Sequence, residues 1–320
     1  MLGHGQRLLA DDLAHPMTDD AADPEVLVIG AGPAGLTAAT YLGRFLRRVL
    51  IADAGEPRAC WIPVSHNMPG FPAGITGGAI LSRLRDQAEE YGAVIEPGAV
   101  ETLRRDGDGF VARLNGRDLR VRAVLLATGV MDHHPDLPGV ENAIRRSLVR
   151  ICPICDGYEA RDKAVAVIGH DDKGVREAAF LRTYSDRVTL IHIGAPDALT
   201  DRAALGRLGI TMVETAIENV EIEGDRVTAL GWGGAFKTFD MVDSALGTTP
   251  NASLAETLGA ETGGDGRLVV DPHQLTTVPG LYAAGDVVRG LNQIAVATAE
   301  AAIAATAVHN ALREADGLSV

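Results

Sequence analysis

Two cysteines separated only by Pro153 and Ile154 are the residues of this sequence best suited to chemistry. Cys152 and Cys155 can close a small disulfide ring, and each can lower the thiol pKa of the other, which makes them a redox pair. Asp156 follows directly and can donate or accept a proton when a thiolate leaves. We therefore expect Cys152, Cys155 and Asp156 to form a catalytic unit.

Other roles for the cysteines find less support. A zinc site needs four ligands, and only the remote Cys60, His133 and His134 stand out as further candidates, so we predict no metal. Three cysteines in 320 residues make no disulfide framework, which indicates a reducing, cytoplasmic compartment. We interpret Cys60 as a small, buried apolar side chain.

A glycine-rich string stands between an expected strand at residues 26–30 and an expected helix at residues 34–45: Gly30-Ala31-Gly32-Pro33-Ala34-Gly35. In such a string Gly30 permits the tight turn, Gly32 lets the backbone approach a pyrophosphate, and Gly35 lets the helix pack closely on the strand. The positive end of the helix, at Pro33 and Ala34, then faces the phosphates. Asp53 closes the next strand and can bind the ribose hydroxyls, so we predict a dinucleotide site.

A late segment favours FAD over NAD. An expected strand at residues 281–284 runs into Gly285-Asp286, and Gln293-Ile294 then begin a long helix that reaches about residue 312. This resembles the flavin-binding signature of the flavoproteins with two dinucleotide-binding domains, in which the Asp holds the ribityl chain. A helix dipole near the flavin would stabilise its anionic reduced form.

The strand and helix pattern of the glycine string occurs a second time, with a strand at residues 165–169, a helix at 173–184 and a strand at 188–193. A short antiparallel meander is expected after each unit, at residues 99–105, 109–114 and 118–121, and again at 216–220, 226–232 and 236–241. Each half then returns as an apolar strand, at residues 123–127 before Thr128-Gly129 and at residues 244–246 before Gly247-Thr248.

The fold class that follows is α/β, with two doubly wound, Rossmann-type FAD/NAD(P)-binding domains, each with a β-meander insertion. We expect an FAD-binding domain at residues 24–130 and 245–320, and an NADPH-domain-like unit carrying the dithiol at residues 131–244. Residues 1–23 have no secretory-signal pattern and read as a flexible extension, with Met17 as a second possible start.

The order of these motifs resembles the low-molecular-weight thioredoxin reductase family along residues 24–312. The resemblance implies that Cys155 lies against FAD, that Cys152 attacks the substrate disulfide and that Asp156 is the acid and base. It also implies FAD contacts from Asn67, Thr128 and Gly129, a homodimer, and as substrate a thioredoxin-like protein or a small dithiol or disulfide.

The second glycine string departs from the family pattern. Gly169 and Gly174 match Gly30 and Gly35, but Asp171 stands where Gly32 does, and Asp172 adds a further negative charge. A like-charge contact at about 4 Å costs on the order of 4 kcal/mol at an effective dielectric constant near 20.

The arginine pair with which the family grips the 2′-phosphate of NADPH is also missing. The strand ends instead in His192-Ile193-Gly194, and the next arginine is Arg202. In addition, Asn292 precedes Gln293 where the family usually has arginine. The sequence therefore argues against NADPH as a cofactor.

Four functions remain open. The leading one is a dithiol/disulfide oxidoreductase whose electron partner is a small carrier protein or oxygen. The others are an NADPH-dependent thioredoxin reductase, an oxygen-dependent dithiol oxidase, and a non-catalytic FAD-binding redox sensor. Dithiol oxidases commonly have His after the second Cys, where this chain has Asp156. The net charge of −14 argues against nucleic acid, and no apolar run reaches the length of roughly 18 residues that suggests a membrane span.

Overall fold

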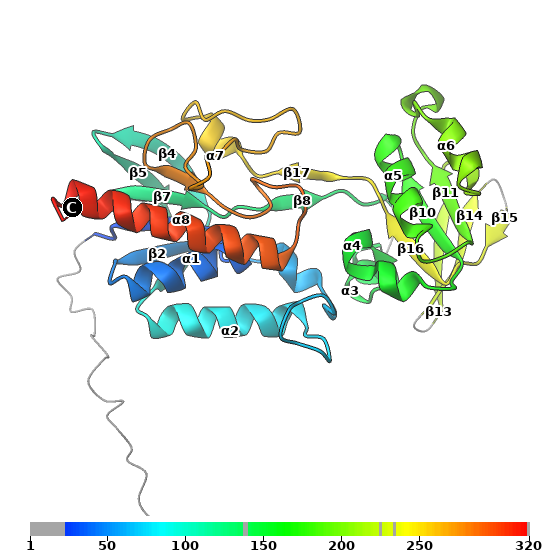
Figure 1. The fold of residues 1–320 in the computed structure, drawn as a ribbon, viewed down its shortest axis with the longest axis horizontal. Coiled ribbons are helices and arrows are strands. Elements are labelled where there is room, and N and C mark those ends of the chain that lie inside the picture. Colours follow the sequence, from blue (N-terminus) through cyan, green and yellow to red (C-terminus); the bar gives the residue numbers. More distant parts are fainter. Residues whose placement is uncertain (1–22, 137–139, 224–225, 233–234, 319–320) are drawn as a thin grey trace, which may run out of the picture.

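The computed structural model describes residues 23–136, 140–223, 226–232 and 235–318. Two lobes are joined by two extended segments, β8 (Val130–Asp132) and β17 (Thr248–Pro250), which pair antiparallel (Figure 1). The expected flexible extension lies outside the described residues, except for Asp23.

A five-stranded parallel sheet forms the centre of the first lobe. Its order is β18-β7-β1-β2-β3, and its strands are β1 (Val26–Ile29), β2 (Val49–Asp53), β3 (Val94–Pro97), β7 (Ala123–Leu126) and β18 (Leu281–Ala283). The strands β1, β7 and β18 are fully buried along their length, as their continuous apolar runs require in a parallel sheet covered on both faces.

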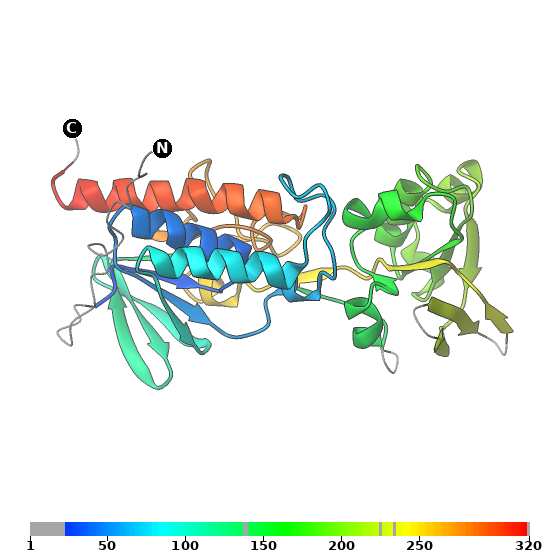
Figure 2. The same cartoon turned by 90° about the horizontal axis from the view of Figure 1, so that it is seen from below.

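Three helices lie side by side on one face of this sheet (Figures 1 and 2). They are α1 (Pro33–Arg44), α2 (Gly77–Glu90) and α8 (Ile294–Ala315). Alanines dominate the contact between α1 and α8, so the two backbones approach closely. By length and composition alone α8 is apolar enough to cross a membrane, but one of its faces belongs to this core, where a helix of a soluble protein has the same composition.

A meander of three antiparallel strands covers the other face. Its strands are β4 (Val100–Asp106), β5 (Gly109–Leu114) and β6 (Arg117–Val121), which confirms the predicted first excursion. Phe110 of β5 is fully buried against the sheet and anchors the meander to the lobe.

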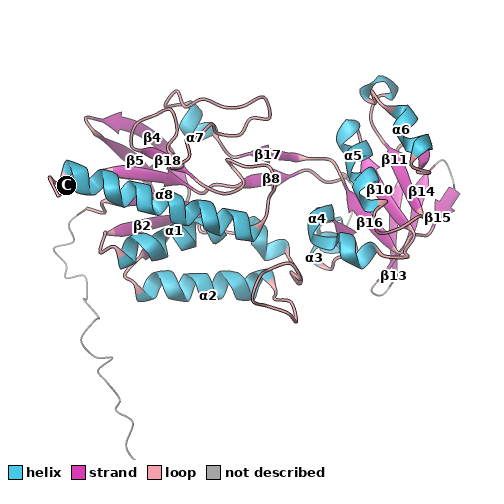
Figure 3. Cartoon of the chain, viewed as in Figure 1, coloured by secondary structure: helices cyan, strands magenta, loops and turns pink. Residues whose placement is uncertain are grey.

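The second lobe repeats the arrangement with the order β12-β11-β10-β16-β9. All its pairs are parallel, and its strands are β9 (Val149–Arg150), β10 (Val165–Gly169), β11 (Val188–His192), β12 (Thr211–Glu214) and β16 (Met241–Ser244). Its helices are α3 (Val140–Arg145), α4 (Pro153–Asp156), α5 (Asp172–Leu181) and α6 (Arg202–Arg207), and α7 (Ser253–Glu256) lies in the first lobe (Figure 3).

The predicted elements of the second half were partly wrong. The return strand expected at residues 244–246 is β16, which begins at Met241 and ends at Ser244. The second meander consists of β13 (Asn219–Glu223), β14 (Arg226–Trp232) and β15 (Ala235–Lys237), so its first strand starts later and its third ends earlier than predicted. The fold class itself, two doubly wound α/β units each with a meander, is confirmed.

Candidate active site

A cavity of about 820 Å³ opens between the carboxyl ends of the first sheet and the dithiol of the second lobe. Most of the predicted site residues line it: Gly30, Gly32, Pro33, Ala34, Asp53, Asn67, Thr128, Gly129, Cys152, Cys155, Asp156, Gly285, Asp286, Gln293 and Ile294. Ligand pockets in proteins commonly measure about 300–1,000 Å³. The fold therefore collects residues that are far apart in sequence around one volume of the size a large cofactor needs.

The first glycine string forms a tight turn from β1 into α1. Gly30 has a φ of +110°, and a Cβ there would meet the carbonyl oxygen of Ala127 at 2.4 Å. A Cβ on Gly35, the one predicted residue that does not line the cavity, would lie 1.8 Å from the carbonyl oxygen of Gly30. A Cβ on Gly32 would meet only Pro57, at 3.8 Å, so this backbone faces open space in the cavity. Gly30 and Gly35 thus shape the turn, whereas Gly32 leaves room for a ligand.

Asp53 stands at the end of β2 with its side chain turned to the cavity. One carboxylate oxygen accepts a hydrogen bond from the Gly55 amide at 3.1 Å, and the other lies 2.6 Å from Nη2 of Arg85. These contacts fix the carboxylate while leaving lone pairs for a ribose.

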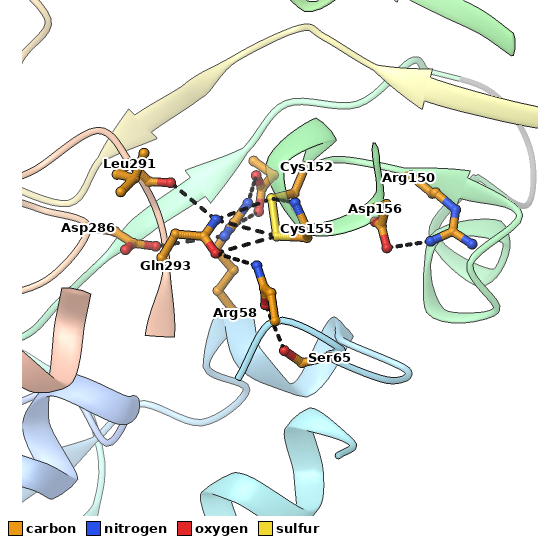
Figure 4. The surroundings of a disulfide bond; sticks show 11 residues. Arg58, Ser65, Arg150, Cys152, Cys155, Asp156, Asp286, Leu291 and Gln293 are labelled. Atoms are coloured by element: carbon orange, nitrogen blue, oxygen red, sulfur yellow. Dashed lines mark hydrogen bonds and ion pairs between the residues drawn. A yellow bond between two sulfur atoms is a disulfide. The ribbon is translucent and has the colours of Figure 1, made fainter. Parts of the chain in front are cut away.

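Cys152 and Cys155 are joined in a disulfide that faces the same cavity (Figure 4). Cys152 is the N-cap of α4 and accepts the Cys155 amide at 3.2 Å, and Pro153 occupies the first helical turn. The amide nitrogen of Gln293, just before α8, lies 3.5 Å from each sulfur. Its carbonyl oxygen accepts a hydrogen bond from Asn67 at 2.9 Å, which orients the amide. Gln293 therefore contacts the dithiol directly as well as lining the cavity.

Asp156 points away from the disulfide and forms an ion pair with Arg150 of β9 (Figure 4). Burial raises the pKa of Asp156 above its usual range, although the Arg150 guanidinium opposes the shift. A carboxyl of this kind holds a proton at a higher pH than an exposed aspartate does.

Asp286 lies at the cavity wall beside Arg58. The nearest atoms of the two groups are 3.8 Å apart, and Arg58 also binds Asp132 through two hydrogen bonds of 2.5 and 2.8 Å. Burial raises the pKa of Asp286 despite the nearby guanidinium. Arg58 thus connects the cavity to β8, the segment that leads to the second lobe.

Three residues around the cavity were not predicted from the sequence: Arg58, Arg150 and Asn251. Asn251 donates to the carbonyl of Thr128 at 2.9 Å and accepts the Thr128 hydroxyl through its own carbonyl at 2.7 Å, which fixes the Thr128-Gly129 turn. The partners of Arg58 and Asn251 lie in distant segments, whereas Arg150 and Asp156 are six positions apart but meet only through the fold of the second lobe.

Cys60 is exposed, so the prediction of a buried side chain was wrong. It lies in a short 3₁₀ turn, η1 (Arg58–Trp61), in which Ala59 is the buried residue and Cys60 points outward. Its thiol pKa is raised by partial burial and by the nearby Glu56 carboxylate, which disfavours the thiolate form.

In the second glycine string, strand β10 and helix α5 pack closely, as in the first, but the middle position, which would face a ligand, is Asp171 instead of glycine. A Cβ on Gly169 would meet the Gly174 Cα at 2.7 Å, so strand and helix approach as closely as the glycines predict. Asp171, in the position of Gly32, is the N-cap of α5, and its carboxylate accepts the Lys173 amide at 2.8 Å. An acidic side chain of the protein itself therefore occupies the anion-binding end of this helix.

The loop after β11 offers little to a phosphate either. A Cβ on Gly194 would lie 2.1 Å from the carbonyl oxygen of His170, so no larger side chain fits there unchanged. The Arg202 guanidinium is bound by Glu214 at 2.5 Å. Asp172 accepts two hydrogen bonds from Thr200, which lower its carboxyl pKa and keep it charged.

The large cavity has the features that FAD requires. It combines the open backbone at Gly32, a carboxylate at the end of β2, the start of the 22-residue helix α8 and a disulfide within one enclosure. Among the described residues, no group of three or more His, Cys, Asp or Glu side chains is placed to hold a metal ion.

Comparisons with known proteins show the family of this chain. The model of the pyridine nucleotide-disulphide oxidoreductase family matches residues 24–301. A thioredoxin reductase of Listeria monocytogenes is 30% identical over 294 residues, which are 88% of this chain and 91% of that protein.

Solved structures extend the similarity to the whole fold. The crystal structure of HlmI is 32% identical, with a TM-score of 0.85 over 92% of this chain and 94% of that one. A thioredoxin reductase from Streptococcus pyogenes is 25% identical, with a TM-score of 0.84 over 91% of this chain and 98% of that one.

Proposed function

This chain belongs to the pyridine nucleotide-disulphide oxidoreductase family as a thioredoxin-reductase-like member, and on that premise we propose that it exchanges electrons with a thiol or disulfide substrate without using NADPH. The observation that carries the proposal is the placement of both sulfurs of the Cys152–Cys155 disulfide on the cavity that also contains the first glycine string. The family membership indicates FAD as the cofactor of that cavity.

In this proposal the backbone at Gly32 and the N-terminus of α1 hold the pyrophosphate of FAD, and Asp53 holds the adenosine ribose. The remainder of the cofactor is surrounded by the start of α8 at Gln293 and Ile294, and by Asn67, Thr128, Gly129 and Asp286. Bound FAD supplies a two-electron redox partner for the dithiol.

The protein residues manage the sulfur chemistry. Cys152 exchanges with the substrate, and Cys155 is the sulfur that leaves and returns within the pair. We assign to Asp156 the proton that a departing thiolate takes up, on the raised pKa of its carboxyl, although in the disulfide form this side chain points away from the sulfurs to Arg150. The Gln293 amide, 3.5 Å from each sulfur, stabilises negative charge on whichever sulfur is a thiolate.

The second nucleotide site supports the exclusion of NADPH. The Asp171 carboxylate caps α5 where a pyrophosphate would bind, and Asp172 remains charged beside it. Lys173, next to Asp172 in the sequence, lies 3.7 Å from the Glu177 carboxylate, so its charge is already partly offset. The electron partner is then a small carrier protein or oxygen, and the substrate is a thioredoxin-like protein or a small dithiol or disulfide.

The second candidate is an NADPH-dependent thioredoxin reductase, which the names of the relatives from Listeria and Streptococcus favour. Both candidates share the dithiol and FAD and differ only in the electron source. For either one we propose a cytoplasmic homodimer, whose subunit number light scattering can measure.

A test of the proposed dithiol uses three matched Cys→Ser variants. The FAD-loaded protein, mixed with dithiothreitol without oxygen, should lose its visible flavin absorbance. Cys152→Ser and Cys155→Ser should slow this loss by roughly 10²-fold or more, because electrons then lack the dithiol route. Cys60→Ser, which removes an exposed thiol outside the disulfide, should bleach like the wild type. Bleaching at the wild-type rate in Cys155→Ser would show that the dithiol does not connect substrate and flavin.

A further inference from the structure

A second, smaller cavity of about 260 Å³ also reaches the dithiol. Cys152 lines it, whereas Cys155 lines only the large cavity. Cys152 is therefore the sulfur shared by the two volumes. A substrate that enters the small cavity meets Cys152 without passing through the cofactor cavity.

The walls of the small cavity combine apolar side chains with charged side chains of both signs, the negative ones from Asp132 and Glu177. Ile154, Phe180 and Leu291 are 45%, 39% and 45% exposed, so a partly apolar molecule finds uncovered surface there. Lys173 and Arg176, from adjacent turns of α5, supply positive charge.

Arg176 differs from the other cations of this cavity. Arg58 is bound to Asp132, and Lys173 lies 3.7 Å from Glu177. Arg176 is exposed and has no hydrogen bond or ion pair with any residue that the structure describes. The Arg176 guanidinium lines the same cavity as Cys152 and can attract an anion, although the Asp172 and Glu177 carboxylates offset part of its charge.

We propose that this cavity binds the substrate, and that the substrate is a low-molecular-weight anionic thiol or disulfide whose carboxylate pairs with Arg176. The proposal rests on the function proposed above and specifies its substrate class. The volume is below the range of about 300–1,000 Å³ common for drug-sized ligands, so it suits a small molecule.

The chemistry is thiol–disulfide exchange and balances within the site. A substrate thiolate attacks the Cys152 sulfur, a bond forms between the two sulfurs, and the Cys152–Cys155 bond breaks with Cys155 leaving as a thiolate. A second substrate thiolate then attacks the substrate sulfur of this mixed disulfide and releases Cys152. The substrate becomes a disulfide, the enzyme pair becomes a dithiol, and the two substrate protons pass to the enzyme or to water. The reverse sequence reduces a substrate disulfide.

The test isolates the Cys152 step from flavin chemistry. In FAD-loaded Cys60→Ser/Cys155→Ser protein, Cys152 is the remaining thiol, and its attack on a linear disulfide leaves a stable mixed disulfide that mass spectrometry counts. Two small disulfides serve as probes, the dianionic dithiodipropionate and the neutral bis(hydroxyethyl) disulfide. The quantity compared is the ratio of their modification rates, in which intrinsic thiol reactivity cancels between variants.

Adding Arg176→Glu should lower the ratio of anionic to neutral rate about tenfold, because an attractive contact becomes repulsive. Arg120→Glu is the matched control, since it makes the same exchange on an exposed arginine of the first meander, and it should leave the ratio unchanged. An unchanged ratio in Arg176→Glu would overturn the substrate site while leaving the flavin-bleaching test of the proposed function untouched. Failure of both probes to modify Cys152 would overturn the proposed function and the substrate site together.

Discussion

At the scale of single residues, the contact between Gln293 and the disulfide could not be predicted from the local sequence. The motif places Gln293 at the start of α8, yet its amide lies 3.5 Å from sulfurs about 140 positions earlier in the chain. A neutral disulfide accepts weakly from such an amide, whereas a thiolate accepts strongly. The contact should therefore favour the reduced state of the pair.

Gln293→Leu tests this contact. A hydrogen bond to a charged group contributes roughly 1.5–3 kcal/mol, and about 1.4 kcal/mol corresponds to roughly 30 mV for a two-electron couple. We expect the reduction potential of the pair to become more negative by about 30–60 mV. Equilibration in dithiothreitol redox buffers, followed by trapping of free thiols, measures it. The same exchange at the exposed Gln87 of α2 should cause no shift, and a potential that stays constant in Gln293→Leu would refute the stabilising role.

Some properties of single residues could be predicted from the sequence, and others could not. The types of Cys152, Cys155 and Asp156 predicted their placement at one cavity, because a redox pair with a neighbouring acid is a local pattern. Cys60 was misjudged because the exposure of a cysteine in a four-residue 3₁₀ turn depends on what the rest of the fold leaves uncovered. The pairing of Arg150 with Asp156 could not be predicted, because it depends on the place of β9 at the edge of the second sheet.

At the scale of elements, the two glycine strings show that one string contains two separable functions. The pairs Gly30/Gly35 and Gly169/Gly174 both keep strand and helix in close contact. Only the first string has a glycine at the middle position, where the backbone is open to the cavity. The sequence predicted this difference correctly because close packing and ligand approach depend on different positions.

Two Gly→Ala variants separate these functions. Gly32→Ala meets no protein atom closer than 3.8 Å, so its thermal unfolding without FAD should match the wild type while FAD affinity falls by roughly tenfold or more. Gly35→Ala must displace the Gly30 carbonyl and should lower the free energy of unfolding by about 2 kcal/mol or more. Calorimetry and FAD titration measure both effects. Normal FAD affinity in Gly32→Ala would contradict the placement of the pyrophosphate at this backbone.

The strand β16 carries an acid that a buried strand rarely contains. Asp243 is fully buried, and neither of its carboxylate oxygens has a hydrogen-bond donor among the described residues. The Glu177 carboxyl from α5 lies close enough to share a proton with it. Burial and this neighbour raise the pKa of Asp243 well above its usual value.

Asp243→Asn should stabilise the protein at neutral pH. The pKa of Asp243 is raised in the folded state, so folding loses stability as the pH rises from about 4, where the unfolded chain ionises, toward the folded pKa. The variant should gain about 1–3 kcal/mol in the free energy of unfolding at about pH 8, and the gain should vanish near pH 4.

Urea unfolding across that pH range measures the gain. Asp186→Asn, the same exchange at an exposed position, serves as the control and should show none. If the variant were less stable than the wild type at every pH, the Asp243 carboxylate would stabilise the fold, which contradicts the prediction.

At the scale of the whole molecule, the two lobes have similar folds, but they contribute differently to the two cavities that reach the dithiol. The carboxyl ends of the first sheet, with an open glycine string, face the disulfide across the large cavity. The corresponding string of the second lobe is closed by Asp171, and α5 contributes cationic side chains to the small cavity instead. The repeat and its parallel sheets were predictable from two similar apolar patterns, whereas the strand order and the cavities depend on contacts that no single segment encodes.

The most direct test of the account is anaerobic rapid mixing of the FAD-loaded wild-type protein with NADPH, NADH and dithiothreitol in separate experiments, with visible flavin absorbance as the readout. Final addition of dithionite gives the fully reduced signal in each sample. We expect dithiothreitol to bleach the flavin and neither nicotinamide to do so on the same time scale. Rapid and complete bleaching by NADPH would contradict this expectation, because electrons would then enter through the site that Asp171 and Asp172 are proposed to close.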